Sequence, residues 1–302
     1  MTGHRHKVVG LGEILWDMLP DGKQLGGAPA NFAYISTLLG NEGIVASRVG
    51  CDSLGNEAVG QLAALGVTTE FVERDTVHPT GTVPVQVDHA GQPTFEIAEG
   101  VAWDFLEWTP HWQELAERVD AICFGSLAQR AATSRATIRQ FLGAARKEAV
   151  RVFDVNLRQA FFSREVLSDS MKFADIVKLN HEELPRIMQL FGLEHRDEIA
   201  SADALMELHH LKLICVTRGC RGSLLINSQG LNEHPGYRIQ VADAIGAGDA
   251  FTAGLVHEYL RGSSLSEMNE IANRVGAWVA SQVGAMPSPG DGGIRSDMAR
   301  IG

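Results

Sequence analysis

The chain has 302 residues, with 26 basic and 37 acidic side chains and a formal net charge of −11. This length suits one large α/β domain or two small ones, and it is enough to bury a substantial core. The acidic balance, without any basic cluster interleaved with aromatic residues, argues against nucleic acid as a partner. No stretch approaches the roughly twenty apolar residues that cross a membrane, and nothing resembles a signal peptide. We therefore expect a cytoplasmic protein with no membrane partner.

Short apolar runs alternate with amphipathic segments, as in a parallel sheet covered by helices on both faces. The predicted strands are Lys7 to Gly12, Ala121 to Phe124, Arg151 to Val155, Ile176 to Leu179 and Leu213 to Thr217. The predicted helices are Ala28 to Leu39, Ser134 to Lys147, Pro185 to Leu190, Ala202 to His209 and Asp249 to Leu260. No repeat, low-complexity tract or flexible linker interrupts this series. We expect an α/β fold, with a doubly wound, mostly parallel sheet, in a single domain over residues 1–302.

Two segments do not fit this alternation and have the pattern of β structure. They are Ile14 to Leu25 and Thr80 to Ile97. In the second segment, Val83, Val85 and Val87 alternate with other residues between Pro79 and a predicted turn at residues 88–91. A period of two that ends in a glycine-containing turn is typical of a hairpin.

A first glycine-rich turn, Gly26-Gly27-Ala28-Pro29-Ala30-Asn31, opens a predicted helix. Its proline suits the first helical position, and Phe32, Ile35 and Leu39 form an apolar stripe behind it. Asn31 would then project from the first turn toward whatever lies over the helix end. An exposed Asn in a tight turn explains the same residues equally well.

A second glycine-rich turn places Gly246, Ala247 and Gly248 at the start of a helix, directly before Asp249. Glycines let the backbone approach a ligand closely, and the free N–H groups and positive helix end favour an anion. Asp249 is either a helix-start residue or a base beside that anion. Taken without context, the turn favours the helix-start interpretation.

Together, the segments GGAPANFAYISTLLG and DAIGAGDAF resemble the two signatures of the ribokinase-like carbohydrate kinases, also called the PfkB family. Further matches follow in the family's order over essentially the whole chain: Gly12-Glu13 with Asp17, Asp154 to Arg158, Asn180 to Glu183, Val216 to Gly219, and Gly284-Ala285 with Ser288. The Gly-Glu opening, GGAPAN and DVNLR look most like fructokinases. The resemblance implies a ribokinase-like fold, with a small β-sheet lid at about residues 13–25 and 79–106 inserted in one kinase domain.

The resemblance also implies an ATP-dependent sugar kinase that transfers the γ-phosphate to a sugar hydroxyl, with fructose to fructose 6-phosphate as the leading reaction. Phosphoryl transfer needs an oriented hydroxyl, an electrostatic clamp on the γ-phosphate and usually a divalent ion. Asp249 matches the family's base, and the backbone N–H groups of Gly246, Ala247 and Gly248 match its anion hole. The chain carries neither a P-loop sequence nor the catalytic loop of protein kinases.

On the sugar side, Asp17, Gly27 and Asn31 match the family's substrate contacts. Carboxylates and amides suit sugars because each hydroxyl both donates and accepts hydrogen bonds. Arg158 is implied to lie near the substrate and the transferred phosphate, with an ordinary surface arginine as the alternative. Asp154 can equally be explained as a strand-end residue that accepts nearby backbone N–H groups.

On the phosphate side, Asn180 and Glu183 match a motif that organises magnesium and phosphates largely through water. The same spacing is typical of a helix cap followed by a glutamate. The implied nucleotide contacts are Thr217, Gly219 and Gly222 on one turn, and Asn273, a candidate adenine neighbour, on the helix before Gly284. A plain β-turn explains the two glycines almost as well.

Four positions match a monovalent-cation site found in many family members: Asp243, Ile245, Gly284 and Ser288. Here Ala244 stands where the usual motif has a threonine. Backbone carbonyls can still bind the ion, so potassium activation is a hypothesis.

Three functions stay open: a fructokinase; another kinase of this family, for 2-keto-3-deoxygluconate, ribose, a nucleoside or aminoimidazole riboside; and a non-catalytic sugar or nucleotide sensor. The intact Asp249 argues against a sensor, which needs no base. A dinucleotide-binding dehydrogenase is excluded, because Gly10 to Leu15 lacks the third glycine of that fingerprint. Family members often pair through their lids, and an apolar lid face with Val83, Val85 and Val87 would allow a homodimer.

Overall fold

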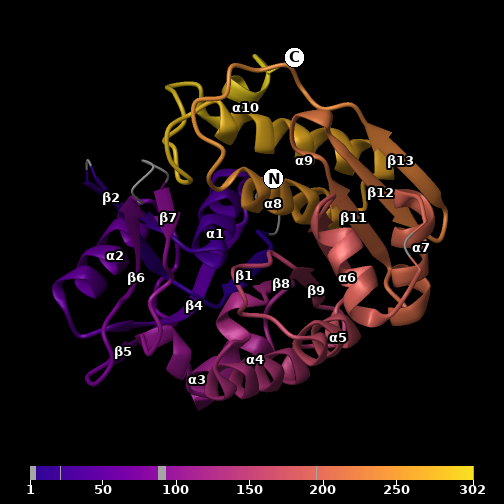
Figure 1. Cartoon of the computed structure of the whole chain (residues 1–302). Coiled ribbons are helices and arrows are strands. Elements are labelled where there is room, and N and C mark those ends of the chain that lie inside the picture. Colours follow the sequence, from indigo (N-terminus) through magenta and orange to yellow (C-terminus); the bar gives the residue numbers. More distant parts are fainter. Residues whose placement is uncertain (1–4, 21, 88–92, 195, 302) are drawn as a thin grey trace.

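The computed structural model describes residues 5–20, 22–87, 93–194 and 196–301. The predicted turn at residues 88–91 and the side chains of Val85 and Val87 therefore lie outside what is described. Figure 1 shows a central sheet with helices on both faces, and a small second sheet to one side.

The central sheet has nine strands, in the order β13-β12-β11-β10-β9-β8-β1-β4-β5. They are β1 (Lys7–Leu11), β4 (Glu42–Gly50), β5 (Val72–Asp75), β8 (Ala121–Gly125), β9 (Val150–Asp154), β10 (Ile176–Asn180), β11 (Leu213–Thr217), β12 (Ser223–Asn227) and β13 (Gly230–His234). The strands from β5 to β11 in this order pair in parallel, and β12 and β13 add an antiparallel edge. After β1, the chain adds β4 and β5 on one side of this strand. It then returns and adds β8 on the other side. Such a reversal of strand order marks the ligand-binding crevice of doubly wound folds.

Neighbouring residues of a strand point to opposite faces of the sheet. Both faces carry apolar residues here, and helices cover each of them. Val8 joins the apolar cluster of α1, α8 and α9, whereas Val9 joins the cluster of α4 to α7. The helices are α1 (Ala28–Leu38), α2 (Ser53–Ala64), α3 (Pro110–Ala116), α4 (Ala132–Ala144), α5 (Arg164–Phe173), α6 (Glu183–Phe191), α7 (Glu198–His209), α8 (Ala247–Leu260), α9 (Leu265–Ala280) and α10 (Gly293–Met298). In the described ranges, no helix combines the length and apolar character needed to cross a membrane.

The predicted doubly wound, mostly parallel sheet is confirmed, and the predicted strands match the observed ones to within one residue at each end. The two helices that follow the glycine turns differ slightly from expectation. Helix α8 begins at Ala247 rather than Asp249, so the GAG segment itself forms the helix start. Helix α1 begins at Ala28, which makes Pro29 its second residue rather than its first.

The other predicted helices also shift at their ends. Helix α4 stops at Ala144 rather than Lys147, because Ala145 turns to an extended conformation. Helix α7 starts at Glu198, before the predicted Ala202, because the side chain of Asp197 accepts the N–H of Ala200. Helix boundaries thus follow caps that the apolar period does not reveal.

The small sheet has four strands in the order β3-β2-β6-β7. They are β2 (Leu15–Leu19), β3 (Gly22–Gly26), β6 (Gly81–Val87) and β7 (Pro93–Phe95). Both predicted β segments contribute to it, which confirms a separate small sheet. The chain returns to the main body through a short 3-10 helix at Ala102–Phe105, where Trp103 is fully buried against Gly81 of β6.

Candidate active site

The two glycine-rich turns meet in space. Helix α1 packs on α8, and Asn31 donates a hydrogen bond from Nδ2 to Oδ2 of Asp249 at 2.7 Å. Asn31 is only 4% exposed, so the alternative of an exposed turn residue is wrong. The amide does lie over a helix end, and what lies there is the start of α8.

Both helix starts need glycine for steric reasons. Gly27 has a φ of 108°, and a Cβ at this position would lie 2.4 Å from the carbonyl oxygen of Glu13. Gly246 caps α8 with a φ of 76°, and a Cβ there would lie 2.5 Å from the Cβ of Ala285. A side chain at Gly27 would therefore displace the backbone at Glu13, and one at Gly246 would displace the loop at Ala285.

Beneath the α8 turn lies a buried ion pair that the sequence motifs did not single out. Lys178, in the middle of β10, places Nζ 3.0 Å from both carboxylate oxygens of Asp154 at the end of β9. Thr252 of α8 donates to Oδ2 of Asp154 at 3.0 Å. A Cβ on Gly248 would lie 3.1 Å from Nζ of Lys178, so the ammonium group sits against the turn. One feature of the sequence could have indicated this ion pair: Lys178 stands inside an apolar strand, and a lysine is almost never buried without a partner.

These charges set the protonation of the candidate base. Burial raises the pKa of Asp249 to about 6, and the negative charge of Asp154 adds to the rise. The hydrogen bond from Asn31 and the charges of Lys178 and Arg158 act in the opposite direction. Burial lowers the pKa of Lys178, but the surrounding carboxylates, Asp154 first, raise it above its ordinary value. A carboxylate that titrates near neutrality beside a fixed positive charge suits general-base chemistry.

Glu13 and Arg158 interact electrostatically with Asp249, and Arg158 also interacts with Asp17 on strand β2. Glu13 is 3% exposed, and its Oε2 has no hydrogen-bond partner within the described residues. Burial raises its pKa to about 7, and the charge of Asp249 adds to this. Burial also raises the pKa of Asp17, which Arg158 lowers and Asp243 raises. The exposed Arg158 thus acts on the carboxyl groups of Glu13, Asp17 and the candidate base Asp249, so two of the predicted sugar contacts, Asp17 and Arg158, lie near each other.

The loop that carries Arg158 has an uncommon backbone conformation. Asn156 and Gln159, which flank Leu157 and Arg158, have positive φ values of 41° and 48°. Such residues cost about 1–3 kcal/mol each and cluster at functional sites. The carboxylate of Glu183 fixes the loop by accepting the N–H of Leu157 through Oε1 at 2.7 Å.

The turn from Asn180 to Glu183 forms a reciprocal cap. Asn180 Oδ1 accepts the N–H groups of Glu182 and Glu183 at 2.9 Å each, while Glu183 Oε2 accepts the N–H of Asn180 at 2.8 Å. Each carboxylate oxygen keeps a further acceptor position, so Glu183 fits a water of a hydrated cation. No three His, Cys, Asp or Glu side chains in the described ranges are grouped to hold a metal directly. The donor set therefore fits a magnesium ion held mainly by phosphates and water.

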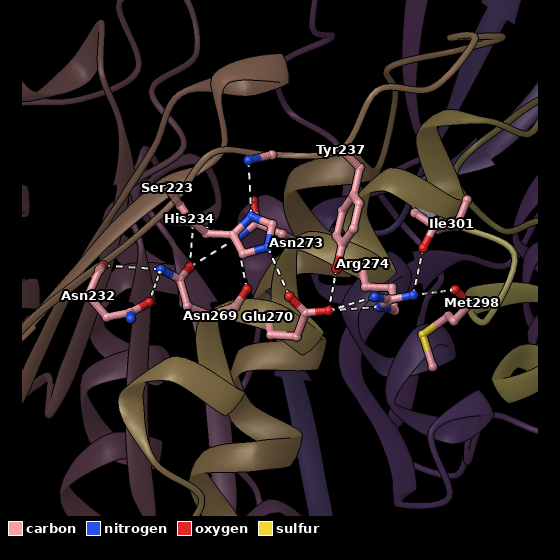
Figure 2. Close-up of polar contacts among 11 residues, drawn as sticks. Ser223, Asn232, His234, Tyr237, Asn269, Glu270, Asn273, Arg274, Met298 and Ile301 are labelled. Carbon is pink, nitrogen blue, oxygen red and sulfur yellow. Dashed lines mark hydrogen bonds and ion pairs between the residues drawn. The ribbon is translucent and has the colours of Figure 1, made fainter.

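The predicted nucleotide residues lie near the antiparallel edge of the main sheet. Thr217 ends β11, and both Gly219 and Gly222 have positive φ values, of 61° and 79°. A Cβ on Gly222 would lie 1.9 Å from the carbonyl oxygen of His234 on β13, so this turn is tighter than a plain one. Asn273 of α9 is 8% exposed and belongs to a hydrogen-bond network against β12 (Figure 2).

The predicted cation positions come from two neighbouring loops. Asp243 Oδ1 accepts the N–H of Ile245 at 2.9 Å, and its Oδ2 accepts the N–H of Gly284 at 3.1 Å. Asp243 therefore joins the loop before α8 to the loop after α9. Ser288, further along the second loop, forms a side-chain hydrogen bond with Tyr34.

Comparisons with known proteins agree with this geometry. The family model for pfkB family carbohydrate kinases matches residues 21–290. A fructokinase of Escherichia coli is 32% identical over 302 residues, covering 93% of this chain and 95% of the relative. The crystal structure of a sugar kinase of Pyrococcus horikoshii in complex with ATP has a TM-score of 0.79 at 28% identity, over 92% of this chain and 94% of that one. A fructokinase of Vibrio cholerae with fructose, ADP and calcium ion has a TM-score of 0.78 at 26% identity, over 93% of this chain and 94% of that one.

A doubly wound sheet with a buried aspartate at a glycine-rich helix start, together with these neighbours, defines a sugar kinase of the ribokinase fold. The chain belongs to the pfkB family of carbohydrate kinases. It is accordingly an enzyme that phosphorylates a hydroxyl group of a sugar.

Proposed function

We propose that the chain transfers the γ-phosphate of ATP to O6 of fructose. The main support for this proposal is Asp249, in the first turn of α8. Its carboxylate accepts a hydrogen bond from Asn31 at 2.7 Å, and its pKa is raised to about 6. Fructose is favoured because two proteins similar to this chain are fructokinases. They are the Escherichia coli fructokinase, at 32% identity, and the fructose-bound fructokinase of Vibrio cholerae, at 26% identity. ATP is favoured because the related Pyrococcus horikoshii kinase was solved with it.

In the proposed mechanism, Asp249 takes the proton of the sugar hydroxyl while that oxygen bonds to the γ-phosphorus. The bond from the γ-phosphorus to the bridging oxygen breaks, and ADP leaves. The N–H groups of Gly246, Ala247 and Gly248 donate to the transferred phosphoryl group at the positive end of α8. Lys178, buried against Gly248, adds a fixed positive charge.

Two sets of residues are proposed to hold the two substrates. Asp17, Gly27, Asn31 and Arg158 are proposed to bind the sugar. Thr217, Gly219, Gly222 and Asn273 are proposed to bind the nucleotide. Magnesium, when bound, neutralises phosphate charge, and Asn180 and Glu183 would hold its waters.

The small sheet is proposed to act as a lid within a single kinase domain, because Asp17 lies on its strand β2. A closed lid would exclude water and limit wasteful hydrolysis of ATP. A homodimer through the lid also stays a proposal. Val83 is 5% exposed and packs within the subunit, so it adds little to an exposed lid face. A monomer-sized scattering mass at micromolar concentration would reject the dimer.

Potassium activation is proposed at Asp243, Ile245, Gly284 and Ser288, where two loops lie together. The carboxylate of Asp243 keeps free acceptor positions beside the backbone carbonyls. Equal turnover in sodium, potassium and choline salts would reject this site.

The deciding experiment is a coupled ADP-release assay with MgATP in potassium buffer. It compares fructose, ribose, 2-keto-3-deoxygluconate, glucose and adenosine with a sugar-free blank. The highest kcat/KM with fructose supports the proposal. Preference for another substrate keeps the kinase and changes its specificity, whereas no turnover together with measurable ATP and sugar binding favours a sensor.

A further inference from the structure

Two buried oxygen atoms near the candidate base lack a hydrogen-bond partner within the described ranges. They are Oε2 of Glu13 and Oδ1 of Asn31. Glu13 is 3% exposed and Asn31 is 4% exposed, and bulk water reaches neither atom. A polar atom that is buried without a partner keeps its full desolvation cost, so these two oxygens require an explanation.

Both side chains lie at the start of helix α1, which packs on α8 (Figure 1). The N–H of Ala28, the first residue of α1, forms a hydrogen bond with the carboxyl group of Glu13. Asn31 lies three residues further along, and residues three apart lie on one side of a helix. The charge of Asp249, which Asn31 contacts directly, also acts on Glu13. The carboxyl group, the amide and the candidate base therefore form one cluster.

The contact with Asp249 sets the orientation of the Asn31 amide. An ionised carboxylate can only accept hydrogen bonds, so Asn31 must turn its NH₂ group toward Oδ2 of Asp249, at 2.7 Å. Oδ1 of Asn31 then lies on the other side of the amide and needs a donor. An ionised Glu13 has only acceptors and offers none.

A single proton on Glu13 satisfies both oxygens. A protonated carboxyl group donates through its O–H, so Oε2 can donate to Oδ1 of Asn31. Burial raises the pKa of Glu13 to about 7 and the charge of Asp249 adds to the rise, whereas backbone N–H groups and Arg158 lower it. Cys123, a buried thiol on β8, also interacts with Glu13. Between about pH 6 and 7, Glu13 thus keeps its proton while Asp249 has lost its own.

We propose that Glu13 is a positioning residue for the base: its protonated carboxyl group donates to Oδ1 of Asn31 and thereby commits the NH₂ group of Asn31 to Asp249. This inference rests on the proposed function, in which Asp249 is the base. When Glu13 loses its proton, two acceptors face each other. The amide then turns its NH₂ group toward Glu13, and Asp249 loses the donor that aligns it.

The pH profile of turnover gives the first test. Wild-type kcat should be highest between about pH 6 and 7 and should fall by about tenfold toward about pH 8.5, as Glu13 ionises. Glu13→Gln places an NH₂ donor at the same position at every pH. Its kcat should match that of wild type near the maximum and stay level up to about pH 8.5. No upper limb in wild type, or the same upper limb in Glu13→Gln, would overturn the proposal.

A matched set of variants separates positioning from packing. Glu13→Met removes the donor and should lower kcat by about tenfold at all pH values above about 6, with little change in the KM for ATP. Glu73→Gln is the control, because Glu73 on β5 is a partly buried glutamate whose pKa burial also raises. It should keep the wild-type profile. A role of Glu13 in packing alone predicts the same profile for wild type and Glu13→Gln, which contradicts the proposal.

A spectroscopic titration keeps this test apart from that of the kinase function. Infrared difference spectra should show one protonated carboxyl group that is lost near pH 7 in wild type and is absent from Glu13→Gln. If no sugar is phosphorylated, the kinase proposal has failed and this titration decides: a carboxyl group that titrates near pH 7 supports the hydrogen bond from Glu13, and its absence rejects it. If Glu13→Gln fails to fold, carbon-13 labelling of the wild-type glutamate carboxyl groups gives the same titration.

Discussion

Two buried polar networks in this protein have opposite character. The network under Asp249 is made of charges, with Lys178 and Asp154 paired at 3.0 Å. The network on α9 is made of amides and a hydroxyl, centred on Asn269 and Asn273. A charged group can stabilise a phosphoryl group during transfer, but the strength of its interaction depends little on orientation. Neutral amides carry a donor and an acceptor at fixed places, so their interactions depend on orientation.

The two networks also differ in energy. Removing one partner of a buried ion pair typically costs about 3–5 kcal/mol, because a charge is left buried and unpaired. A neutral hydrogen bond contributes about 0.5–1.5 kcal/mol. Changes to the charged network should therefore have large effects that depend on pH, and changes to the neutral network should have small effects that do not.

The largest expected effect comes from Asp249→Asn. Without the base, kcat should fall by about 10²–10⁴-fold. Calorimetry should show that the variant still binds nucleotide and sugar, because the amide that replaces the carboxylate keeps the size and the hydrogen-bonding position of the side chain. Turnover within a few-fold of wild type would reject Asp249 as the base.

Lys178→Met tests the charged network through stability. We expect the free energy of unfolding in urea to drop by about 3–5 kcal/mol, since Asp154 would remain buried without its partner. The double change with Asp154→Leu should restore part of the loss. The control, Lys172→Met, removes an exposed lysine that pairs with Asp169 and should cost less than about 1 kcal/mol. Similar losses for both lysines would show that Lys178 is not an essential buried charge.

Glu13→Gln tests the pH dependence. The pKa of Glu13 is raised from 4.5 to about 7 in the folded protein, so the folded state holds the proton more tightly than the unfolded state. Wild-type stability should thus fall as pH rises from about 4.5 to about 7, by on the order of 3 kcal/mol, and Glu13→Gln should remove that slope. In turnover, activity should fall below about pH 6 as Asp249 becomes protonated, and Glu13→Gln should leave this limb in place, because Glu13, with a pKa of about 7, is already mostly neutral there. Parallel stability curves for wild type and variant would contradict this assignment.

Ser223→Ala gives the smallest expected effect and tests the neutral network. Asn273 would keep two acceptors on Asn269, so we expect a loss of about 1 kcal/mol in urea unfolding, with no change between pH 5 and about 8. A loss as large as that of Lys178→Met, or one that varies with pH, would remove the distinction between the two networks.

Local patterns in the sequence were enough for the strands and for the two glycine turns. The apolar run at Ile176 to Leu179 marked β10, and the glycines before Asp249 marked the start of α8. Helix ends were less predictable, because caps such as the side chain of Asp197 compete with the apolar period. The sequence also showed Glu13 within a motif, but nothing local indicated that its carboxyl group would be buried beside the base.

By itself, then, the sequence determined the strands, the glycine-rich start of α8 and the family, because these depend on residues close together in the chain. Only the tertiary structure decided which polar groups meet. Lys178 reaches Asp154 because the parallel register of β9 and β10 places the two residues opposite each other. Asn31 reaches Asp249, 218 residues away, because α1 packs on α8. The orientation of the Asn269 amide on α9 likewise depends on the carbonyl oxygen of Asn232 on β13, a contact that no local pattern encodes.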